Sequence, residues 1–262
     1  MKRPAKDNPL YKHDTPLVDR IDLLAALGLL TRLPISVDGE RAVERGAASA
    51  WAYPLVGVIV GVICATAATL LAAVGLPAGI VAGLILALSV ILTGAMHEDG
   101  LADSADGLWG GWDKARRLAI MKDSHIGVYG VCAIALSLLL RWLALSTIIA
   151  MGAYWVALIA VGALSRCAMV VVMATLLPAR NSGLGKSVGP PPTNTAWLAI
   201  VISIGVAVLT GYPLLVLFAA LASLACGLIA SAKVGGQTGD ILGATQQVTE
   251  TVTLIALVTM IT

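Results

Sequence analysis

Residues 46–96 read GAASAWAYPLVGVIVGVICATAATLLAAVGLPAGIVAGLILALSVILTGAM, a stretch without a single Asp, Glu, Lys or Arg. A helix needs about 20 consecutive apolar residues to cross a bilayer. The stretch is therefore long enough for two membrane-spanning helices, with residues 75–77 as the turn between them. Residues 187–232 form a second uncharged stretch of the same kind. The sequence predicts an all-α, polytopic transmembrane helix bundle.

The composition of the whole chain agrees with a membrane protein. Of its 262 residues, 58% are hydrophobic and 12% are charged, and the mean hydropathy is +0.92, whereas a soluble domain carries about 25% charged residues. Such apolar content excludes a disordered chain, and the unbroken apolar stretches exclude a β-barrel. The four cysteines are solitary, so neither a disulfide framework nor a zinc site is expected. We also expect no nucleic-acid partner.

Apolar segments alternate with polar loops along the chain, and residues 1–262 are predicted to form a single integral membrane domain. About seven spans are predicted, near residues 51–74, 78–95, 127–150, 154–177, 196–211, 213–231 and 247–262. The seventh is the weakest because its apolar segment is short. Within the polar first fifty residues, the apolar segment 23–30 is too short to span and predicts an interfacial or re-entrant helix.

The positive charges predict the orientation. The N-terminal region and every second connection carry 15 of the 17 Lys and Arg residues, and the other connections carry none. The positive-inside rule therefore places these regions in the cytoplasm. The two remaining cations are Arg141, expected at the outer interface, and Arg166, within a span. Every Asp and Glu is expected at or beyond a cytoplasmic end, which favours an enzyme with cytoplasmic catalytic loops over a carrier.

Side chains that could take part in catalysis or metal binding are most concentrated in residues 96–107, MHEDGLADSADG. Asp99, Asp103 and Asp106 are spaced i, i+4 and i+7, which places them within a sector of about 60° on a helix. Three carboxylates on one face repel each other, and a divalent cation would relieve that repulsion. Because the ligands are oxygens, Mg²⁺, Ca²⁺ or Mn²⁺ is favoured over zinc.

Other polar residues are predicted on the same side of the membrane. Asp123 is a further metal candidate because it stands where the third span begins, and Asp240 lies in the Gly-rich segment before the last span, with Glu250 at the base of that span. Arg166 is a functional candidate because charges inside a bilayer are rarely tolerated otherwise. The remaining candidates for binding a substrate are Lys122, Arg180, Lys186 and Gln237.

Several motifs together resemble the cobalamin synthase family, the adenosylcobinamide-GDP ribazoletransferases. They are HEDGLADSADG (97–107), MKDSHIGVYG (121–130), Ser165-Arg166, LPAR (177–180) followed by GLG (183–185), and GGQTGDILGATQ (235–246). TRLP (31–34) and YPLVG (53–57) fit as well. The start of the first motif departs from the family's His-Leu-Asp-Gly form, so Glu98 is not assigned as a ligand.

The resemblance implies the reaction and the roles. Such an enzyme joins adenosylcobinamide-GDP to α-ribazole or its 5′-phosphate with release of GMP, needs Mg²⁺ and resides in the bacterial inner membrane. The metal would be held by Asp99, Asp103 and Asp106, with Asp123 or Asp240. Arg166, Arg180 and Lys186 would clamp phosphate oxygens.

Two alternatives remain open at the level of the sequence. A CDP-alcohol phosphotransferase also uses spaced aspartates in a membrane helix, but its Asp-Gly-x2-Ala-Arg pattern is only partly met at Asp99 and Gly100. A cation or metabolite transporter would place its carboxylates in a broken helix near the middle of the bilayer. The sequence leaves open whether the bundle forms a homo-oligomer or binds other enzymes of cobalamin biosynthesis.

Overall fold

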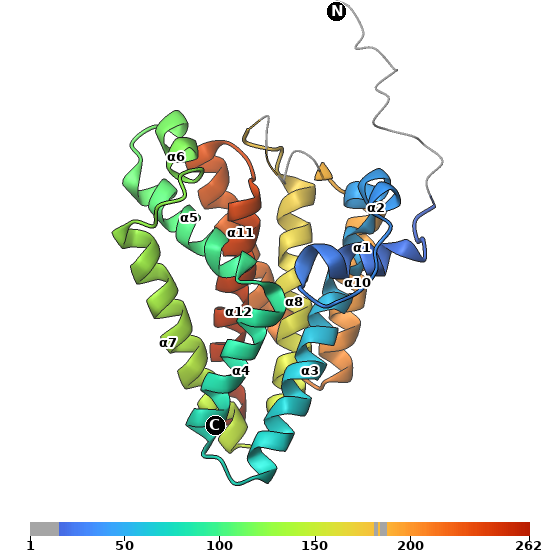
Figure 1. Cartoon of the computed structure of the whole chain (residues 1–262), viewed down its shortest axis with the longest axis vertical. Coiled ribbons are helices and arrows are strands. Elements are labelled where there is room, and N and C mark those ends of the chain that lie inside the picture. The colour runs from blue at the N-terminus through green and yellow to red at the C-terminus, as the bar shows by residue number, and fades with distance from the viewer. Residues whose placement is uncertain (1–15, 181–182, 184–187) are drawn as a thin grey trace, which may run out of the picture.

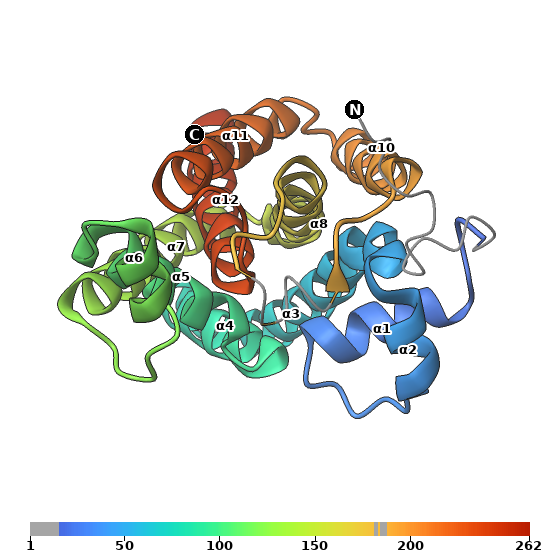
Figure 2. The same cartoon turned by 90° about the horizontal axis from the view of Figure 1, so that it is seen from above.

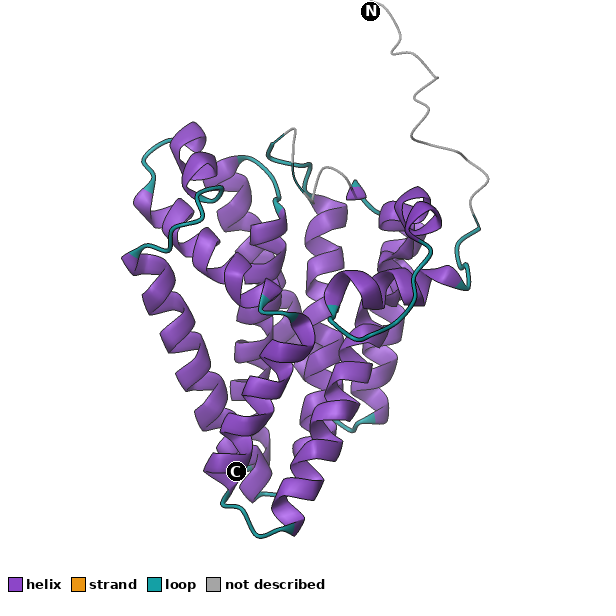
Figure 3. Cartoon of the chain, in the orientation of Figure 1, coloured by secondary structure: helices purple, strands orange, loops and turns teal. Residues whose placement is uncertain are grey.

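The computed structural model describes residues 16–180, 183 and 188–262, and in this part of the chain only helices, turns and loops are present (Figure 3). The helices form one bundle, wide at the end that carries α2 and α6 and narrow at the opposite end (Figure 1). Within the described residues, a single bridge between Pro178 and Gln237 is the only β-type pairing. The predicted all-α bundle is confirmed.

Helices occur at all seven predicted spans. They are α3 (Tyr53–Ala73), α4 (Ala78–Thr93), α7 (Val128–Ala150), α8 (Tyr154–Thr175), α10 (Thr193–Leu209), α11 (Leu215–Val234) and α12 (Gly239–Ile261). The described chain opens with α1 (Ile21–Leu30), α2 (Gly39–Arg45) and the 3-10 helix η1 (Gly46–Ala52). The segment between α4 and α7 was expected to be a polar loop, and it holds two more helices, α5 (Met96–Gly110) and α6 (Lys114–Ile120).

Five helices are long and apolar enough to cross a membrane: the continuous stretch Gly39–Ala73, and α7, α8, α11 and α12. The 16-residue α4 qualifies only together with α5, from which it is bent by 88°, and the 17-residue α10 is shorter than a full span. The chain is therefore a multi-pass membrane protein with five full-length spans, or six if the bent pair is one span.

The helix α8 occupies the centre of the bundle, with α3, α10, α11 and α12 around it (Figure 2). Of its most apolar 18 residues, 78% are buried, compared with 28% for α11. Gly57 and Gly61 of α3 lie directly against the backbone of α8, and a Cβ at Gly57 would collide with the Gly162 carbonyl. The close glycine-mediated packing expected from their four-residue spacing is thus present.

The predicted interfacial helix is α1, and one buried carboxylate attaches it to the bundle. Asp22 accepts hydrogen bonds from Arg45 Nε at 2.6 Å, Arg45 Nη2 at 2.7 Å and Trp51 Nε1 at 2.7 Å. A bidentate Arg–carboxylate pair of this kind fixes both position and orientation. The contact holds α1 against η1, which leads into α3.

The last helix begins earlier than the predicted span of 247–262. It starts at Gly239, and the hydroxyl of Thr238 caps it by accepting a hydrogen bond from the Ile241 N–H at 3.2 Å. The first turns of α12 are rich in Thr and Gln, which lowers their hydropathy and hid them from the sequence pattern. As a result, Asp240 lies in the first turn and Glu250 lies in the middle of the helix instead of at its base.

Candidate active site

Two residues with left-handed backbone separate α4 from α5. Gly94 has φ +63° and Ala95 has φ +56°, and Ala95 is the only non-glycine residue of the described chain with a positive φ. An alanine in this region is uncommon and strained. The break turns α5 by 88° relative to α4, so that its polar sequence runs across the wide end of the bundle (Figure 1).

A glycine contact brings α5 against the start of α12. A Cβ at Gly100 would lie 2.8 Å from the Asp240 carbonyl oxygen and 3.0 Å from Cα of Gly243. Both neighbours are backbone atoms, which cannot rotate away as a side chain can. Glycine at position 100 therefore permits the close approach that places Asp99 and Asp103 beside Asp240.

These three carboxylates form the acidic cluster of the site. The pKa of Asp103 is raised to about 7 by burial and by the nearby charges of Asp99, Asp240 and Asp106, against a smaller opposing effect of Arg180. Within the described residues, the side chains of Asp99 and Asp103 make no hydrogen bond or ion pair, whereas Asp240 pairs with Arg180 at 3.1 Å. The cluster therefore carries more negative charge than the protein around it compensates.

Two backbone hydrogen bonds, which we call the clip, place Arg180 beside the carboxylate cluster. The Ala179 N–H donates to the Gln237 carbonyl at 2.8 Å, and the Gln237 N–H donates to the Leu177 carbonyl at 2.9 Å. These bonds join the segment after α8 to the segment before α12, and the Gln237 side chain is completely buried there. The Nη1 of Arg180 is buried and has no hydrogen-bond partner in the described chain, so the guanidinium has a donor that Asp240 does not use.

The structure gives Asp106, a predicted metal ligand, contacts that the sequence did not indicate. Its two carboxylate oxygens accept hydrogen bonds from the Gly127 N–H at 2.7 Å and the Gly130 N–H at 2.9 Å, at the start of α7. The first N–H groups of a helix have no partner within the helix, and a carboxylate satisfies them. Asp106 is thus a capping residue of α7 because both of its oxygens are already engaged.

Two other predicted residues, Asp123 and Lys122, are not brought to the cluster. Asp123 was expected to bind metal, but it pairs with Nδ1 of His125 at 2.7 Å on the exposed turn before α7. Lys122 is exposed on the same turn, and its side chain makes no hydrogen bond or ion pair with any described residue. The predicted phosphate ligand Lys186 lies outside the described residues.

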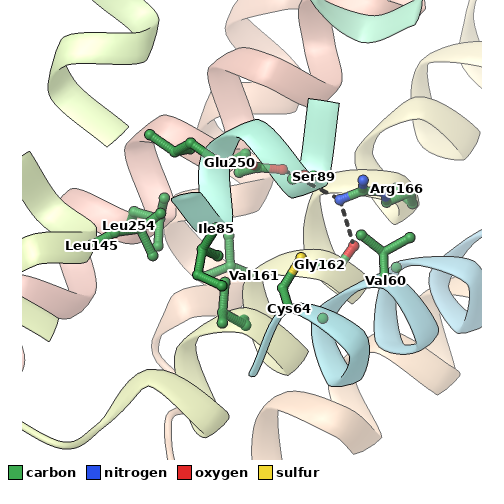
Figure 4. A pocket seen from close by; sticks show the side chains of 14 residues that line it. Val60, Cys64, Ile85, Ser89, Leu145, Val161, Gly162, Arg166, Glu250 and Leu254 are labelled. Atoms are coloured by element: carbon green, nitrogen blue, oxygen red, sulfur yellow. Dashed lines mark hydrogen bonds and ion pairs between the residues drawn. The ribbon is translucent and has the colours of Figure 1, made fainter. Parts of the chain in front are cut away.

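Arg166 was expected to meet the substrate pyrophosphate, and the structure gives it a partner inside the protein instead. It is 3% exposed, and its Nη1 lies 3.3 Å from Glu250 Oε2. Figure 4 shows the two side chains at the edge of a narrow pocket that is bordered by Cys64 and Ile85. In this structure the guanidinium is buried and paired with Glu250, and its role as a phosphate clamp stays a prediction.

Arg141 extends the same network. Expected at the outer interface, it is 1% exposed and pairs with Glu250 at 3.1 Å and with Glu98 at 3.3 Å. Gln247 Nε2 donates to Glu98 at 3.0 Å, and Gln246 Nε2 donates to Glu250 at 2.5 Å. Two arginines thus balance two glutamates inside the bundle, which corrects the expectation that every acid lies at a cytoplasmic end.

The sequence contains a signal for this network. Two arginines within spans each require a counter-charge, and Glu250 follows Gln246 by one helical turn. Because the last span was taken to start at 247, Glu250 was assigned to its base. A helix that starts at Gly239 carries Glu250 to the depth of both arginines.

Comparison with known proteins identifies the family. The family model for cobalamin-5-phosphate synthase matches residues 22–258, which is most of the chain. The chain belongs to this family. No solved structure matches the chain.

Several relatives that match most of this chain are named adenosylcobinamide-GDP ribazoletransferase. The protein of Mesorhizobium japonicum is 43% identical over 245 residues, covering 89% of this chain and 91% of the relative. The protein of Bradyrhizobium diazoefficiens is 41% identical over 240 residues, with 89% and 92% covered. That of Allorhizobium ampelinum is 38% identical over 258 residues, with 94% and 98% covered. Neither the CDP-alcohol phosphotransferase nor the transporter is favoured.

Proposed function

We propose that this chain joins adenosylcobinamide-GDP to α-ribazole or α-ribazole 5′-phosphate and releases GMP, the last assembly step of cobalamin biosynthesis. The family and the common name of the relatives support this proposal. The structural observation that carries it is the convergence of Asp99, Asp103 and Asp240 with Arg180 at the wide end of the bundle. Carboxylates beside a cation with a free donor suit a reaction at a pyrophosphate.

The reaction needs positioning and charge stabilisation more than covalent chemistry. A ribose hydroxyl oxygen of the acceptor forms a bond to the pyrophosphate phosphorus on the cobinamide side, and the bond from that phosphorus to the oxygen of the GMP phosphate breaks. The hydroxyl proton passes to a carboxylate of the cluster. Arg180 donates from its unpartnered Nη1 to a phosphate oxygen.

We propose that Asp99, Asp103 and Asp240 hold Mg²⁺. In the described residues, no group of three His, Cys, Asp or Glu side chains is arranged so that it could hold a metal ion as it stands. The fit rests on charge, because burial and three neighbouring carboxylates raise the pKa of Asp103, and only Arg180 opposes them. When bound, Mg²⁺ would neutralise the phosphate oxygens during the transfer. Asp106 and Asp123 are left out of this ligand set because each has another partner.

The orientation that we propose places this site on the cytoplasmic side of a bacterial inner membrane. The positive charges of the loops support it, and α6 and the clip beside α12 share the wide end with the carboxylate cluster (Figure 1). Both substrates would reach the site from the cytoplasm. The narrow end, where α3 meets α4 and α7 meets α8, would face outward.

Detergent-purified full-length protein tests the function directly. We expect GMP release when adenosylcobinamide-GDP, MgCl₂ and either acceptor are supplied, and none when EDTA replaces Mg²⁺. Asp99→Asn should lower the rate at least about tenfold, as losses around metal ligands do. Glu44→Gln is the matched control, because Glu44 is exposed on α2 and makes no described contact. The absence of GMP from the wild-type reaction with both acceptors would refute the proposal.

A further inference from the structure

An apolar cavity of about 470 Å³ lies between the spans α8, α10 and α11. Both α10 and α11 pack against the central α8, but they make few contacts with each other (Figure 2). The residues that α8 contributes to the lining recur every three or four positions from Leu164 to Leu176, so they form one stripe along the helix. The protein therefore leaves space beside one face of its central helix.

The length and position of this stripe match one leaflet of a bilayer. From Leu164 to Leu176 the chain rises about 18 Å at 1.5 Å per residue. Half of a hydrocarbon core of about 30 Å is about 15 Å. The stripe begins in the middle of α8 and ends where α8 ends, on the side of the wide end. The cavity thus extends from one surface of the hydrocarbon layer to about its middle.

The volume and the chemistry of the cavity suit a hydrocarbon chain. An apolar cavity of about 150 Å³ in another protein holds one benzene ring, so 470 Å³ has room for roughly three such rings, or about 18 carbon atoms. None of the lining residues is charged. The hydroxyls of Thr175, Ser203 and Ser223 donate to backbone carbonyls at 2.8, 2.9 and 3.4 Å. A charged or strongly polar ligand would therefore lose its hydration without gaining a partner.

The cavity adjoins the surface that faces lipid. Ile204 of α10 and Leu224 and Leu228 of α11 line it and are exposed on the outside of the bundle. Because α11 is a full-length apolar span, these side chains contact hydrocarbon when the protein is in a membrane. The chains of the surrounding lipid are therefore continuous with the opening of the cavity.

A helix from a second copy of the protein is too wide for this space. A helix with its side chains is about 10 Å across, so a length of 18 Å fills roughly 1,400 Å³. That volume is about three times the volume of the cavity. A single acyl chain fits, whereas a helix does not.

We propose that this cavity binds one acyl chain of a membrane phospholipid, taken from the leaflet on the side of the wide end. The chain fills the space between α10 and α11 and completes the packing around α8. Its site ends at Leu176, directly before the clip that begins at Leu177. The inference does not rest on the proposed function, because no lining residue belongs to the carboxylate cluster.

The first test fills the cavity with a side chain. Gly227 lies in the lining, and its Cβ would meet only Val172, at 4.0 Å, so Gly227→Phe places a ring in the cavity. Native mass spectrometry of the delipidated full-length protein, titrated with dioleoyl-phosphatidylethanolamine, measures the affinity. We expect one tightly bound lipid in the wild type and a Kd at least about tenfold higher in Gly227→Phe.

Gly205→Phe in α10 is the matched control. It introduces the same ring at a glycine whose Cβ would meet nothing within 4 Å and which does not line the cavity. It should bind the lipid as the wild type does. Glycerophosphoethanolamine, which has the headgroup but no acyl chains, should not compete with the lipid. Competition by it would place binding at the headgroup and overturn the acyl-chain site.

The second test uses the wild type alone. A phospholipid with a photoreactive diazirine in its acyl chain is added at one lipid per protein and crosslinked, and the modified peptides are mapped. We expect more crosslinks on residues 164–176 of α8 than on Leu139 and Leu143 of α7. Those two leucines are exposed on the outside of the bundle, whereas α8 is the central helix. Lipid that binds only around the bundle would modify α7 more than α8.

The outcomes decide between the possible occupants. Equal lipid affinity of the wild type and Gly227→Phe overturns the proposal, as does a wild type that binds no lipid tightly. If Gly227→Phe breaks up a dimer of the wild type and leaves lipid affinity unchanged, a second copy covers the cavity and the proposal is wrong. If Gly227→Phe does not fold, the crosslinks decide: crosslinks on α8 support the acyl-chain site, and crosslinks confined to outer faces refute it.

Discussion

At the level of single residues, the carboxylates of α5 divide into two kinds according to what surrounds them. Asp106 has both oxygens engaged by backbone N–H groups of α7. Asp99 and Asp103, by contrast, make no hydrogen bond or ion pair with the described residues and repel each other. Spacing alone places all three on one face of a helix. The neighbours of that face separate a residue that caps α7 from two carboxylates that have no partner among the described residues.

The pH dependence of the unfolding free energy of the metal-free protein should reveal the charge repulsion at Asp103. Its folded pKa of about 7 exceeds the ordinary 3.8, so the folded state binds this proton more tightly than the unfolded state. Stability is therefore lost as pH rises from about 4 to 7 and levels off above that. Thermal unfolding in EDTA should show Asp103→Asn gaining on the wild type as pH rises from 5 to 8.

Adding Mg²⁺ at pH 8 should raise Tm of the wild type and not of Asp103→Asn. The control is Asp106→Asn, which loses one of two carboxylate acceptors at the N-terminus of α7 and should lower Tm at every pH. A Tm difference between Asp103→Asn and the wild type that does not change with pH would contradict the charge repulsion that we infer at Asp103.

The buried ion pair between Arg166 and Glu250 leads to a second prediction at the level of single residues. Removing one partner of a buried pair costs about 3–5 kcal/mol, so Arg166→Ala should unfold at a much lower temperature in detergent. Arg166→Lys keeps the charge facing Glu250 and should fold, with kcat/KM of the folded fraction within about threefold of the wild type. A tenfold loss of kcat/KM in Arg166→Lys without a change in Tm would support the role in substrate binding.

At the level of elements, the site depends on how α5 meets α12. The left-handed residues Gly94 and Ala95 turn α5 out of the direction of α4, and Gly100 lets it approach the first turn of α12. The clip at residues 177–179 and 237 then adds Arg180. Each of these contacts joins segments that are distant in sequence, and together they assemble the cluster.

Gly100→Ala should separate these two helices. The added Cβ would meet the backbone at Asp240 and Gly243, so α5 must shift by a few tenths of an ångström or more. A displacement of about 1 Å at a catalytic site can cost a hundredfold in rate, and we expect kcat/KM to fall at least about tenfold. Gly205→Ala in α10 is the control, because its Cβ would enter open space and it should retain full activity. Normal kinetics in Gly100→Ala would exclude a tight α5–α12 contact.

At the level of the whole molecule, the bundle has two unlike ends. The wide end carries α2 and α6, and the narrow end carries turns between helices and the C-terminus (Figure 1). Fifteen of the 17 Lys and Arg residues lie in the regions predicted to be cytoplasmic. The charged regions within the described chain therefore coincide with the end that holds the candidate active site.

Cysteine labelling tests this orientation. In a background without the four native cysteines, Ser124→Cys should resist a membrane-impermeant reagent in intact cells and react after permeabilisation, because residue 124 lies on an exposed turn of the wide end. Met151→Cys, on the exposed turn between α7 and α8 at the other end, should react in intact cells. The reverse pattern would invert the topology and place the site outside the cytoplasm.

The sequence by itself determined the fold class, the seven apolar helices and the charge asymmetry, because hydropathy and charge are sums over local residues. It also determined the motifs that identify the family. The first turns of α12 escaped the pattern because their Thr, Gln and Glu side chains are buried against other polar groups inside the bundle. A hydropathy sum counts such residues as polar, although their neighbours satisfy them.

Only the tertiary structure decided which partners those residues have. Arg141 and Arg166 meet Glu250 across 109 and 84 residues of sequence, and no local pattern can assign such a pair. The central position of α8 was equally hidden, because its hydropathy of 2.3 equals that of the peripheral α11. Burial depends on which faces of the helices meet. Contacts between distant segments determine which helix faces are buried. They also determine which charged residues lie at the candidate active site and which pair inside the bundle.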